Sequence, residues 1–375
     1  MKVVIAIDSL KGSLSSIEAG NIIKDAVLNI KPHAHVIVKP LADGGEGTVD
    51  SLIEGLGGEK IPLTVTGPLG SKVNTYYGYI KDTSTAVIEM ASAAGITLVP
   101  EKDKDPLQAT TYGVGEMIRH AINLGCQNFI IGIGGSATND GGLGMLKALG
   151  WEFFDKNGED VGEGGQALSK IDVICTDNVY KPVYSCSFKV ACDVTNPLCG
   201  PNGATYIYGP QKGVSDDIRD SLDLAMEHYA SMTEKYLSIN AKDAAGAGAA
   251  GGMGYAFLSY LNAELTPGIE LILNAIDLET EIKDADIVIT GEGRLDHQTV
   301  MGKAPVGVAK LAKKYGKKVI AFAGSVTKDA AICNDIGIDA FFPIIREIIT
   351  LQEAMKPEVA AENMKATVEQ VFRLL

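Results

Sequence analysis

Ala-Asp-Ile-Val-Ile at residues 285–289 is followed directly by Thr-Gly-Glu-Gly-Arg-Leu-Asp at residues 290–296. The apolar run predicts a buried strand, and the polar run places two acids, an arginine and two glycines at its end. Ligands of open α/β sheets bind outside the carboxyl ends of strands, so packing alone explains this charge poorly. Gly302-Lys303 then opens a helix and adds a cation. The stretch therefore predicts a sheet-edge site for an anionic ligand, together with a metal.

Strand-loop-helix order recurs at both ends of the chain. Ser15 and Glu18 have the spacing of a capping box, which predicts a helix that ends before Pro32. Apolar strands are expected at residues 2–7, 35–38, 286–290, 318–323 and 340–344. Strands that alternate with helices in this way predict a parallel sheet with helices on its faces.

The middle of the chain has a different pattern. Residues 73–81 and 85–90 are short strands joined by a polar turn, which predicts a hairpin, and residues 215–237 form an amphipathic helix. We therefore expect an α/β protein with a discontinuous domain at residues 1–66 and 285–375. A second, inserted α/β domain is expected at residues 67–284.

Charge and composition exclude several classes of protein. The formal net charge of −14 argues against nucleic acid and anionic membranes as general partners, although a local cluster of cations or amides can still bind a polyanion. The six cysteines include no CxxC pair, which favours free thiols in a reducing cytosol. No signal peptide and no apolar run of ~18 residues is found. We expect a soluble, cytoplasmic protein.

Four further polar, glycine-rich segments stand at expected strand ends. In residues 8–13, Asp8, Ser9 and Lys11 fit either a phosphate-binding turn or ordinary turn and capping chemistry. In residues 41–48, the adjacent Gly44 and Gly45 let a ligand approach the backbone closely. Asp43 and Glu46 fit a base, a metal ligand or a helix cap.

Residues 134–142 form a segment that consists of small and polar residues. Its amides and hydroxyls suit phosphate oxygens, and its amide and carboxylate side chains suit Mg²⁺ or a hydroxyl; the candidates are Gly134, Gly135, Ser136, Thr138, Asn139 and Asp140. In residues 191–200, Asp193 and Asn196 fit a substrate or metal site. Cys192 and Cys199 are spaced too widely for a zinc knuckle.

Missing motifs narrow the chemistry. No P-loop, HExxH, GxSxG or protein-kinase pattern is found, and the GxGxxG at residues 246–251 does not follow a clear strand. The motifs supply acids, lysines, one arginine and free backbone amides, but no thiol, serine or histidine nucleophile. This set fits phosphoryl transfer, in which positioning and charge neutralisation dominate. An Asp can accept the hydroxyl proton. An NAD-dependent hydroxy-acid dehydrogenase and a non-catalytic ligand-binding protein are the alternatives.

Six motifs in order resemble the bacterial-type glycerate kinase family that lacks a P-loop, the type-1 family. They are DSLKGS at 8–13, PLADGGEGT at 40–48, GGSATNDGG at 134–142, CDVTNPL at 192–198, GAGAAGGMG at 246–254 and TGEGRLDHQTVMGKAPVGVA at 290–309. The resemblance implies ATP-dependent phosphorylation of D-glycerate with Mg²⁺, in glycerate, glyoxylate or sugar-acid metabolism. It favours 2-phosphoglycerate over 3-phosphoglycerate. It also implies a Rossmann-like domain joined to a second α/β domain, with the active site in the cleft between them.

The resemblance suggests roles for the candidate residues. Lys11 and Arg294 are expected to bind the glycerate carboxylate or to neutralise the transferred phosphoryl group. Asp43, Asp140 and Asp296 compete for the role of base, with Asp43 favoured, and Asp193 and Glu292 are the candidates for Mg²⁺. The remaining candidates are expected to bind substrate or nucleotide; they are Asp8, Ser9, Gly44, Gly45, Gly134, Gly135, Ser136, Thr138, Asn139, Asn196 and Lys303. D-Glycerate and ATP are the expected partners, and a monomer or a homodimer is expected.

Overall fold

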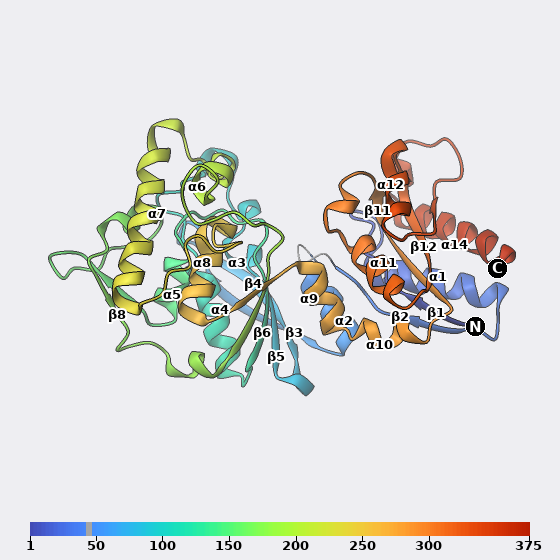
Figure 1. Cartoon of the computed structure of the whole chain (residues 1–375), viewed down its shortest axis with the longest axis horizontal. Helices are drawn as coiled ribbons and strands as arrows, with labels where there is room; N and C mark the ends of the chain where they lie inside the picture. Colours follow the sequence, from blue (N-terminus) through green and yellow to red (C-terminus); the bar gives the residue numbers. More distant parts are fainter. Residues whose placement is uncertain (43–46) are drawn as a thin grey trace. The chain divides into compact units, whose positions relative to one another are not determined.

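The computed structural model of the chain describes residues 1–42 and 47–375, and for Met301 the backbone only. The described residues divide into two compact units (Figure 1). The first contains residues 1–42, 50–57 and 269–375, and the second contains residues 47–49 and 58–268. The first unit is therefore built from both ends of the chain.

The first unit is organised around a five-stranded sheet in which every neighbouring pair is parallel. In spatial order its strands are β13 (Ala340–Pro343), β12 (Lys318–Val326), β11 (Ile287–Leu295), β1 (Lys2–Ile5) and β2 (His35–Val38). From β1 the chain continues to β2 on one side, and from β11 it continues through β12 to β13 on the other. The direction of winding therefore reverses between β1 and β11, which is a topological switch point.

Helices complete this unit. They are α1 (Ser16–Ile30), most of α2 (Thr48–Leu56), α9 (Gly268–Ala275), α10 (Leu278–Lys283), α11 (Ala304–Lys314), α12 (Ile332–Asp335), α13 (Leu351–Ala354) and α14 (Pro357–Leu374). Buried residues of α1 and α14 pack with Val3, Ile5 and Ile289 in one hydrophobic cluster. Val4 and Val288 alternate with these side chains and are fully buried as well, while α11 contacts β11 and β12. Because side chains alternate along a strand, helices cover both faces of the sheet.

Two local predictions meet the structure differently. The predicted capping box at the start of α1 is confirmed. Ser15 Oγ accepts a hydrogen bond from the backbone amide of Glu18, and the Glu18 side chain accepts one from the backbone amide of Ser15. The polar run at residues 290–296, in contrast, does not follow its strand. Most of it lies within β11, where Glu292 is paired with Ala323 and Arg294 with Ser325 of β12. The prediction of a strand ending at Thr290 was wrong, because β12 extends to Val326 and continues to pair with this run.

The second unit contains a six-stranded mixed sheet. In spatial order its strands are β10 (Glu264–Thr266), β9 (Ser187–Ala191), β6 (Asn128–Gly132), β5 (Thr85–Glu89), β4 (Lys72–Ile80) and β3 (Glu59–Thr66). The first four are mutually parallel, whereas β4 is antiparallel to both β5 and β3. The predicted hairpin at residues 73–90 is therefore confirmed. A small antiparallel pair, β7 (Glu152–Phe154) and β8 (Val173–Cys175), stands apart.

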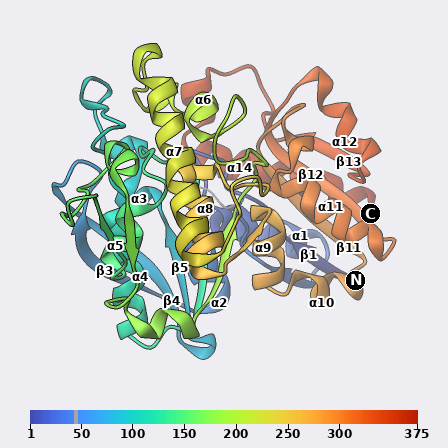
Figure 2. The same cartoon turned by 60° about the vertical axis from the view of Figure 1, so that its left-hand side comes forward.

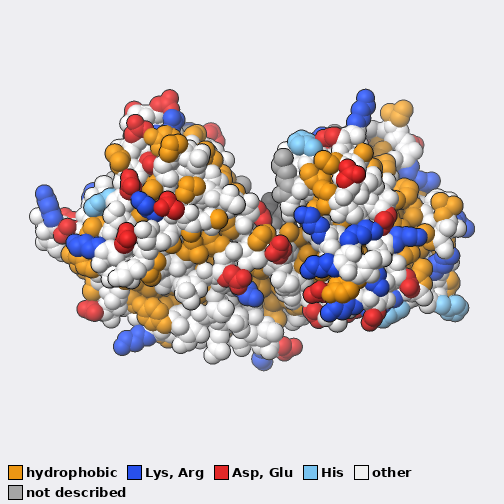
Figure 3. Space-filling model, viewed as in Figure 1, with side chains coloured by type: hydrophobic (Ala, Val, Ile, Leu, Met, Phe, Trp, Pro, Cys, Tyr) orange, Lys and Arg blue, Asp and Glu red, His pale blue; other side chains and the backbone are white. Residues whose placement is uncertain are grey.

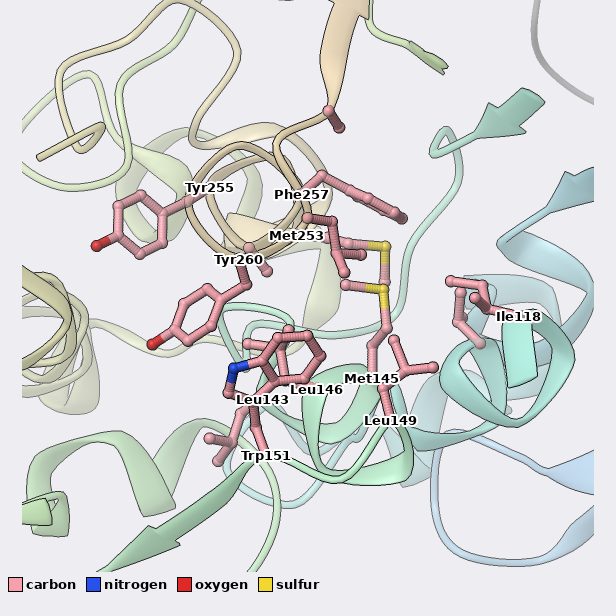
Figure 4. Close-up of a cluster of buried hydrophobic side chains, with 14 of the residues drawn as sticks. Ile118, Leu143, Met145, Leu146, Leu149, Trp151, Met253, Tyr255, Phe257 and Tyr260 are labelled. Carbon is pink, nitrogen blue, oxygen red and sulfur yellow. The ribbon is translucent and has the colours of Figure 1, made fainter. Parts of the chain in front are cut away.

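The helices of the second unit surround one large core. They are α3 (Ala91–Ala94), α4 (Tyr112–Asn123), α5 (Leu143–Ala148), α6 (Ala204–Tyr208), α7 (Asp216–Leu237) and α8 (Ala249–Leu261). Figure 2 shows α7 as the long yellow helix that runs along this unit. Trp151 lies in the core among Leu143, Met145 and Leu146 (Figure 4). Its ring packs edge-on against that of Tyr260, with 5.8 Å between the ring centroids. The expected fold class, a parallel α/β unit plus a mixed α/β unit, is confirmed.

The unit boundaries differ from the expected residues 66/67 and 284/285. All of β3 pairs with β4, from Glu59 with Tyr79 to Thr66 with Lys72, so β3 belongs to the second unit. Helices α9 and α10 belong to the first unit. The sequence analysis did not recognise residues 59–66 as a strand, so it could not assign them to the sheet of the second unit. Among the described residues, no helix combines the length and the apolar character that a membrane span requires.

Ser15→Ala removes the oxygen that caps α1. Loss of a serine N-cap costs about 1 kcal/mol, so we expect hydrogen exchange in the first turn of α1 to become about fivefold faster. Glu18→Ala and the double variant complete a mutant cycle. Coupling between the two sites supports the reciprocal cap, and purely additive effects would contradict it.

Candidate active site

The switch point of the first unit forms a pocket. The Asp8 amide still donates to Gly291 O at 3.0 Å, and the chain then turns away from the sheet through residues 9–14. This turn passes close to β11, since a Cβ built on Gly293 would lie 3.5 Å from the Lys11 amide nitrogen. The pocket that opens here has a volume of about 510 Å³. Crevices at switch points are the usual ligand sites of open α/β sheets.

Seven of the residues proposed from sequence line this one pocket. They are Asp8, Ser9, Lys11, Glu292, Arg294, Asp296 and Lys303. They come from two segments that are almost 300 residues apart in the chain. The structure therefore brings together three cations and three acids that the sequence places in separate motifs.

Glu292 of β11 is a buried acid in this pocket. Its side chain accepts hydrogen bonds from Thr299 Oγ1 at 2.7 Å and from Lys303 Nζ at 3.2 Å. Burial raises the pKa of Glu292, and both of these partners oppose that rise. Thr299, which also accepts from the Asp296 amide at 3.1 Å, was missed in the sequence analysis because no motif distinguishes a buried threonine.

Arg294 and Asp296 form the open side of the charged cluster. Their side chains are 3.4 Å apart, from Arg294 Nε to Asp296 Oδ2, and the Gln298 amide donates to Asp296 Oδ1 at 2.8 Å. The Arg294 side chain is 63% exposed, whereas that of Asp296 is only 12% exposed. Asp296 is thus held by the protein, while most of the arginine side chain is accessible to a ligand.

A helix N-terminus adds to the positive potential. Lys303 directly precedes α11, and no side chain caps that end of the helix. Unpaired amides and the helix dipole favour an anion at such a position. Separately, Lys and Arg side chains gather over α11 on the face shown in Figure 3. The later turns of the helix contribute Lys310, Lys313 and Lys314, of which Lys313 pairs with Asp339 at 2.6 Å. A chain with an acidic total charge thus has a local cationic surface.

Part of the pocket lining is apolar and was not anticipated. It is formed after β13 and in α14, by Ile344, Ile345, Leu351, Ala354, Met355 and Ala360, with Asn363 beside them. These residues lie outside the glycine-rich motifs. Nothing in the local sequence distinguishes them from ordinary packing residues.

In the second unit, three glycine-rich segments contact one another. The loop after β6 (residues 134–142) meets residues 246–252 through a hydrogen bond from the Gly141 amide to Gly251 O, 2.9 Å long. The segment after β9 joins them, as the Gly248 amide donates to Asn196 O at 3.0 Å. Gly251 has φ +69°, and a Cβ there would lie 2.0 Å from Thr138 O. Glycine is required at this position by both conformation and space.

This contact explains residues 246–251 without a dinucleotide. The element that precedes them is α7, not a strand, and Ala250, Gly251 and Gly252 have left-handed backbone angles where a Rossmann helix would begin. The strand-turn-helix context of a dinucleotide fingerprint is therefore missing. The weak dinucleotide match in the sequence therefore corresponds to residues that pack against the 134–142 loop.

Asp140 is part of a buried hydrogen-bond network. It accepts from the Thr111 amide and hydroxyl and from the amides of Gly142 and Gly144, at 2.8–3.2 Å. Burial raises the pKa of Asp140, and these bonds oppose the rise. Its side chain is fully buried. This geometry suits a carboxylate that holds the 134–144 backbone in place, whereas a base must reach its substrate.

Lys212 supports the same loop and was missed in the sequence analysis. Its Nζ donates to Ser136 Oγ and to Thr138 O, both at 2.6 Å, and the residue is only 2% exposed. Burial lowers the pKa of Lys212 to about 7, and the charge of Asp140 partly opposes this. Lys212 lies in a short turn far along the chain, where nothing in the sequence suggests burial.

The other candidates of the second unit have various surroundings. Gly134 and Gly135 are exposed, while Thr138 and Asn139 are fully buried and Asn139 Nδ2 donates to Thr205 Oγ1 at 3.0 Å. The side chains of Asp193 and Asn196 are engaged as well: Asp193 accepts from the Gly268 amide, and Asn196 accepts from Tyr208 Oη. Asp43, Gly44 and Gly45 lie outside the described residues.

The proposed metal ligands are distributed over both units. Glu292 is in the first unit and Asp193 is in the second. Within residues 1–42 and 47–375, no group of three or more His, Cys, Asp or Glu side chains is arranged to hold a metal ion. A Mg²⁺ ion that is bound with phosphates needs only one or two carboxylates, so this finding leaves the proposed ligands untested.

Fold and pocket together define an α/β protein with a charged pocket at a topological switch point. A model of the glycerate kinase family matches residues 3–375. Glycerate kinase from Bacillus subtilis is 48% identical over 99% of this chain and 97% of the relative, and glycerate 2-kinase from Escherichia coli is 48% identical over 98% of each. A crystal structure from Salmonella typhimurium LT2, described as a glycerate kinase 2, is 46% identical with a TM-score of 0.92, covering 100% of this chain and 98% of that one. The chain therefore belongs to the glycerate kinase family, a family of kinase enzymes.

The depressed pKa of Lys212 predicts a pH-dependent stability. Between about 7 and the ordinary value of 10.5, the unfolded chain binds one more proton than the folded chain, so wild-type stability rises with pH relative to a variant without this lysine. We expect the free energy of unfolding of Lys212→Met, measured relative to wild type, to be highest near pH ~6 and lowest near pH ~9. Urea unfolding followed by the fluorescence of Trp151, in the same unit, measures the difference.

Lys102→Met, which removes an exposed positive charge from the same unit, is the control. It should follow wild type at both pH values. An equal stability difference for Lys212→Met at the two pH values would contradict a depressed pKa.

Proposed function

We propose that this kinase transfers the γ-phosphoryl group of ATP to D-glycerate, with Mg²⁺ as cofactor. The observation that carries the proposal is the pocket at the switch point, where Lys11, Arg294, Lys303 and the N-terminus of α11 converge. Phosphoryl transfer depends on positioning and on neutralising charge, and this pocket supplies both. The names of the relatives support glycerate as the acceptor.

The three cations have different uses in this proposal. Lys11 and Lys303 neutralise phosphate oxygens as point charges, and Lys303 is held in place by Glu292. Arg294 presents a planar fork that suits a carboxylate or the transferred phosphoryl group. The exposed amides of Gly134 and Gly135 remain candidates to contact an anionic group of a substrate, with Ser136 held by Lys212 beside them.

The donor set in the pocket fits Mg²⁺. Glu292 supplies carboxylate oxygens, the hard ligands that this ion prefers, and the phosphates would supply others, so a single carboxylate of this pocket is enough. Glu292 is our first candidate to hold the ion and Asp193 our second. When bound, the ion would offset negative charge on the phosphates.

In the transfer step an aspartate accepts the proton of the glycerate hydroxyl. The hydroxyl oxygen forms a bond to the γ-phosphorus, and the bond to the oxygen of ADP breaks. Asp43 is our candidate base. Asp140 is buried and accepts four hydrogen bonds, and Asp296 contacts Arg294 and the backbone. We therefore assign both residues a positioning role.

We further propose 2-phosphoglycerate as the product and the cytoplasm as the compartment. The E. coli relative at 48% identity is named glycerate 2-kinase, which supports phosphorylation at the 2-position. All six cysteines are free thiols, which supports a reducing compartment.

The enzymatic proposal is tested by Mg·ATP turnover with D-glycerate, followed by ³¹P NMR. We expect ADP and 2-phosphoglycerate to appear together in equal amounts. 3-Phosphoglycerate alone would overturn the regiochemistry. ADP formation that does not depend on D-glycerate, or no product from a folded protein that binds ATP, would overturn glycerate as acceptor.

Asp43→Asn tests the base. Because general-base catalysis contributes ~10²–10⁴-fold, we expect kcat to fall by that factor with little change in the KM for glycerate. Asp25→Asn, on the exposed face of α1, is the control and should leave kcat unchanged. If Asp43→Asn changes only KM while Asp296→Asn lowers kcat, the base is Asp296 instead.

A further inference from the structure

The pocket of the first unit has two chemically different ends. The turn after β1 and the end of β11 contribute its charged groups, whereas residues 344–360 contribute an apolar wall. Its volume of about 510 Å³ is in the range of ~300–1,000 Å³ that is typical of small-molecule sites. Glycerate and the phosphates of ATP are polar, so the reacting groups leave this wall unexplained.

The apolar wall is exposed to an unusual degree for large hydrophobic side chains. Leu351 is 74% exposed, Ile345 40% and Met355 38%, and all three line the pocket. Contiguous exposed apolar residues that line a pocket typically mark a ligand groove. A ligand that covers them removes apolar surface from water, which favours binding.

Local structure holds this wall in place. Thr350 caps α13 by accepting the Glu353 amide at 3.2 Å, which positions Leu351 at the first residue of the helix. Met355 extends to the turn that carries Lys11, because a Cβ built on Gly12 would lie 2.7 Å from Met355 Cε. Gly12 has φ +79°, so glycine suits both the turn and the methionine that covers it. The apolar wall therefore directly adjoins the cationic turn.

Asn363 adds a polar group to the apolar end. It lines the pocket from α14, and its side-chain amide has no hydrogen-bond partner among the described residues. An asparagine amide both donates and accepts, which is the pattern that matches the edge of adenine. The pocket thus combines cations at one end with an apolar wall and an adaptable amide at the other.

We infer that the apolar wall is the nucleobase subsite of the phosphoryl donor. The base lies against Leu351 and Met355, Asn363 binds its polar edge, and the phosphates point to Lys11 and Lys303. A nucleotide has the same order of groups, with a flat ring of low polarity at one end and a polyanion at the other. This inference rests on the proposed function, since it names the site for the donor of that reaction.

Ala354→Trp tests the subsite by filling it. Isothermal titration with ATP and with inorganic triphosphate separates the base from the phosphates and needs no catalysis. We expect the Kd for ATP to rise at least tenfold, while the Kd for inorganic triphosphate stays unchanged. Leu351→Ala should raise the Kd for ATP severalfold without lowering Tm, because the side chain is mostly exposed.

Ile348→Ala is the matched control. Ile348 belongs to the same segment and is 105% exposed, but it does not line the pocket. It should leave both dissociation constants unchanged. Unchanged ATP binding in both Ala354→Trp and Leu351→Ala would overturn the subsite. So would a change of oligomeric state in Leu351→Ala at unchanged ATP affinity, since a second copy would then cover the wall.

Asn363→Ala tests how the base is recognised. We expect the preference for ATP over GTP, measured as a ratio of Kd values, to fall about tenfold, with binding of inorganic triphosphate unaffected. An unchanged ratio would overturn the role of the amide. These binding results are independent of phosphoglycerate formation, so failure of the subsite is distinguishable from failure of the proposed reaction.

Discussion

Parallel pairing of β1 with β11 is the constraint on which the first unit depends. Val3 pairs with Ile287 and Ile5 with Ile289, so the two ends of the chain must meet before the sheet is complete. These side chains are at most 5% exposed, and burial of their apolar surface stabilises the pairing. Because the sheet is wound outward from this pair in both directions, the only reversal lies between β1 and β11. The ligand pocket follows from that reversal.

The charged groups of the pocket are exposed to it because β1 is shorter than its neighbour β11. β1 ends at Ile5 and its chain leaves the sheet after Asp8, whereas β11 continues to Leu295 with β12 as its partner. The last part of β11 therefore has a sheet neighbour on one side and the turn carrying Lys11 on the other. Glu292 and Arg294 are thereby presented to the pocket from a rigid strand, which places functional groups more reproducibly than a loop would.

In the second unit, buried polar groups hold the glycine-rich loops in place. Asp140 accepts four hydrogen bonds, and Lys212 donates to the loop beside it. Burying a carboxylate and an ammonium is costly, and the hydrogen bonds offset this cost. Apolar side chains could fill the same space but could not bind backbone carbonyls and amides. The arrangement therefore favours a defined loop conformation over maximal stability.

The sequence by itself determined the local features of this protein. Hydrophobic patterning and capping were sufficient for α1, for the alternation of strands and helices at both ends of the chain and for the α/β class, because these depend on near neighbours. The charged and glycine-rich motifs, including Lys11 and Arg294, were also visible as local departures from packing. Only the tertiary structure decided that seven of these residues share one pocket, that the run at 290–296 lies within a strand, and that Thr299, Lys212 and the apolar wall belong with the sites. Except for Thr299, whose partners Glu292 and Asp296 are close in sequence, each of these depends on partners distant in the chain. No local pattern records their burial and hydrogen bonds.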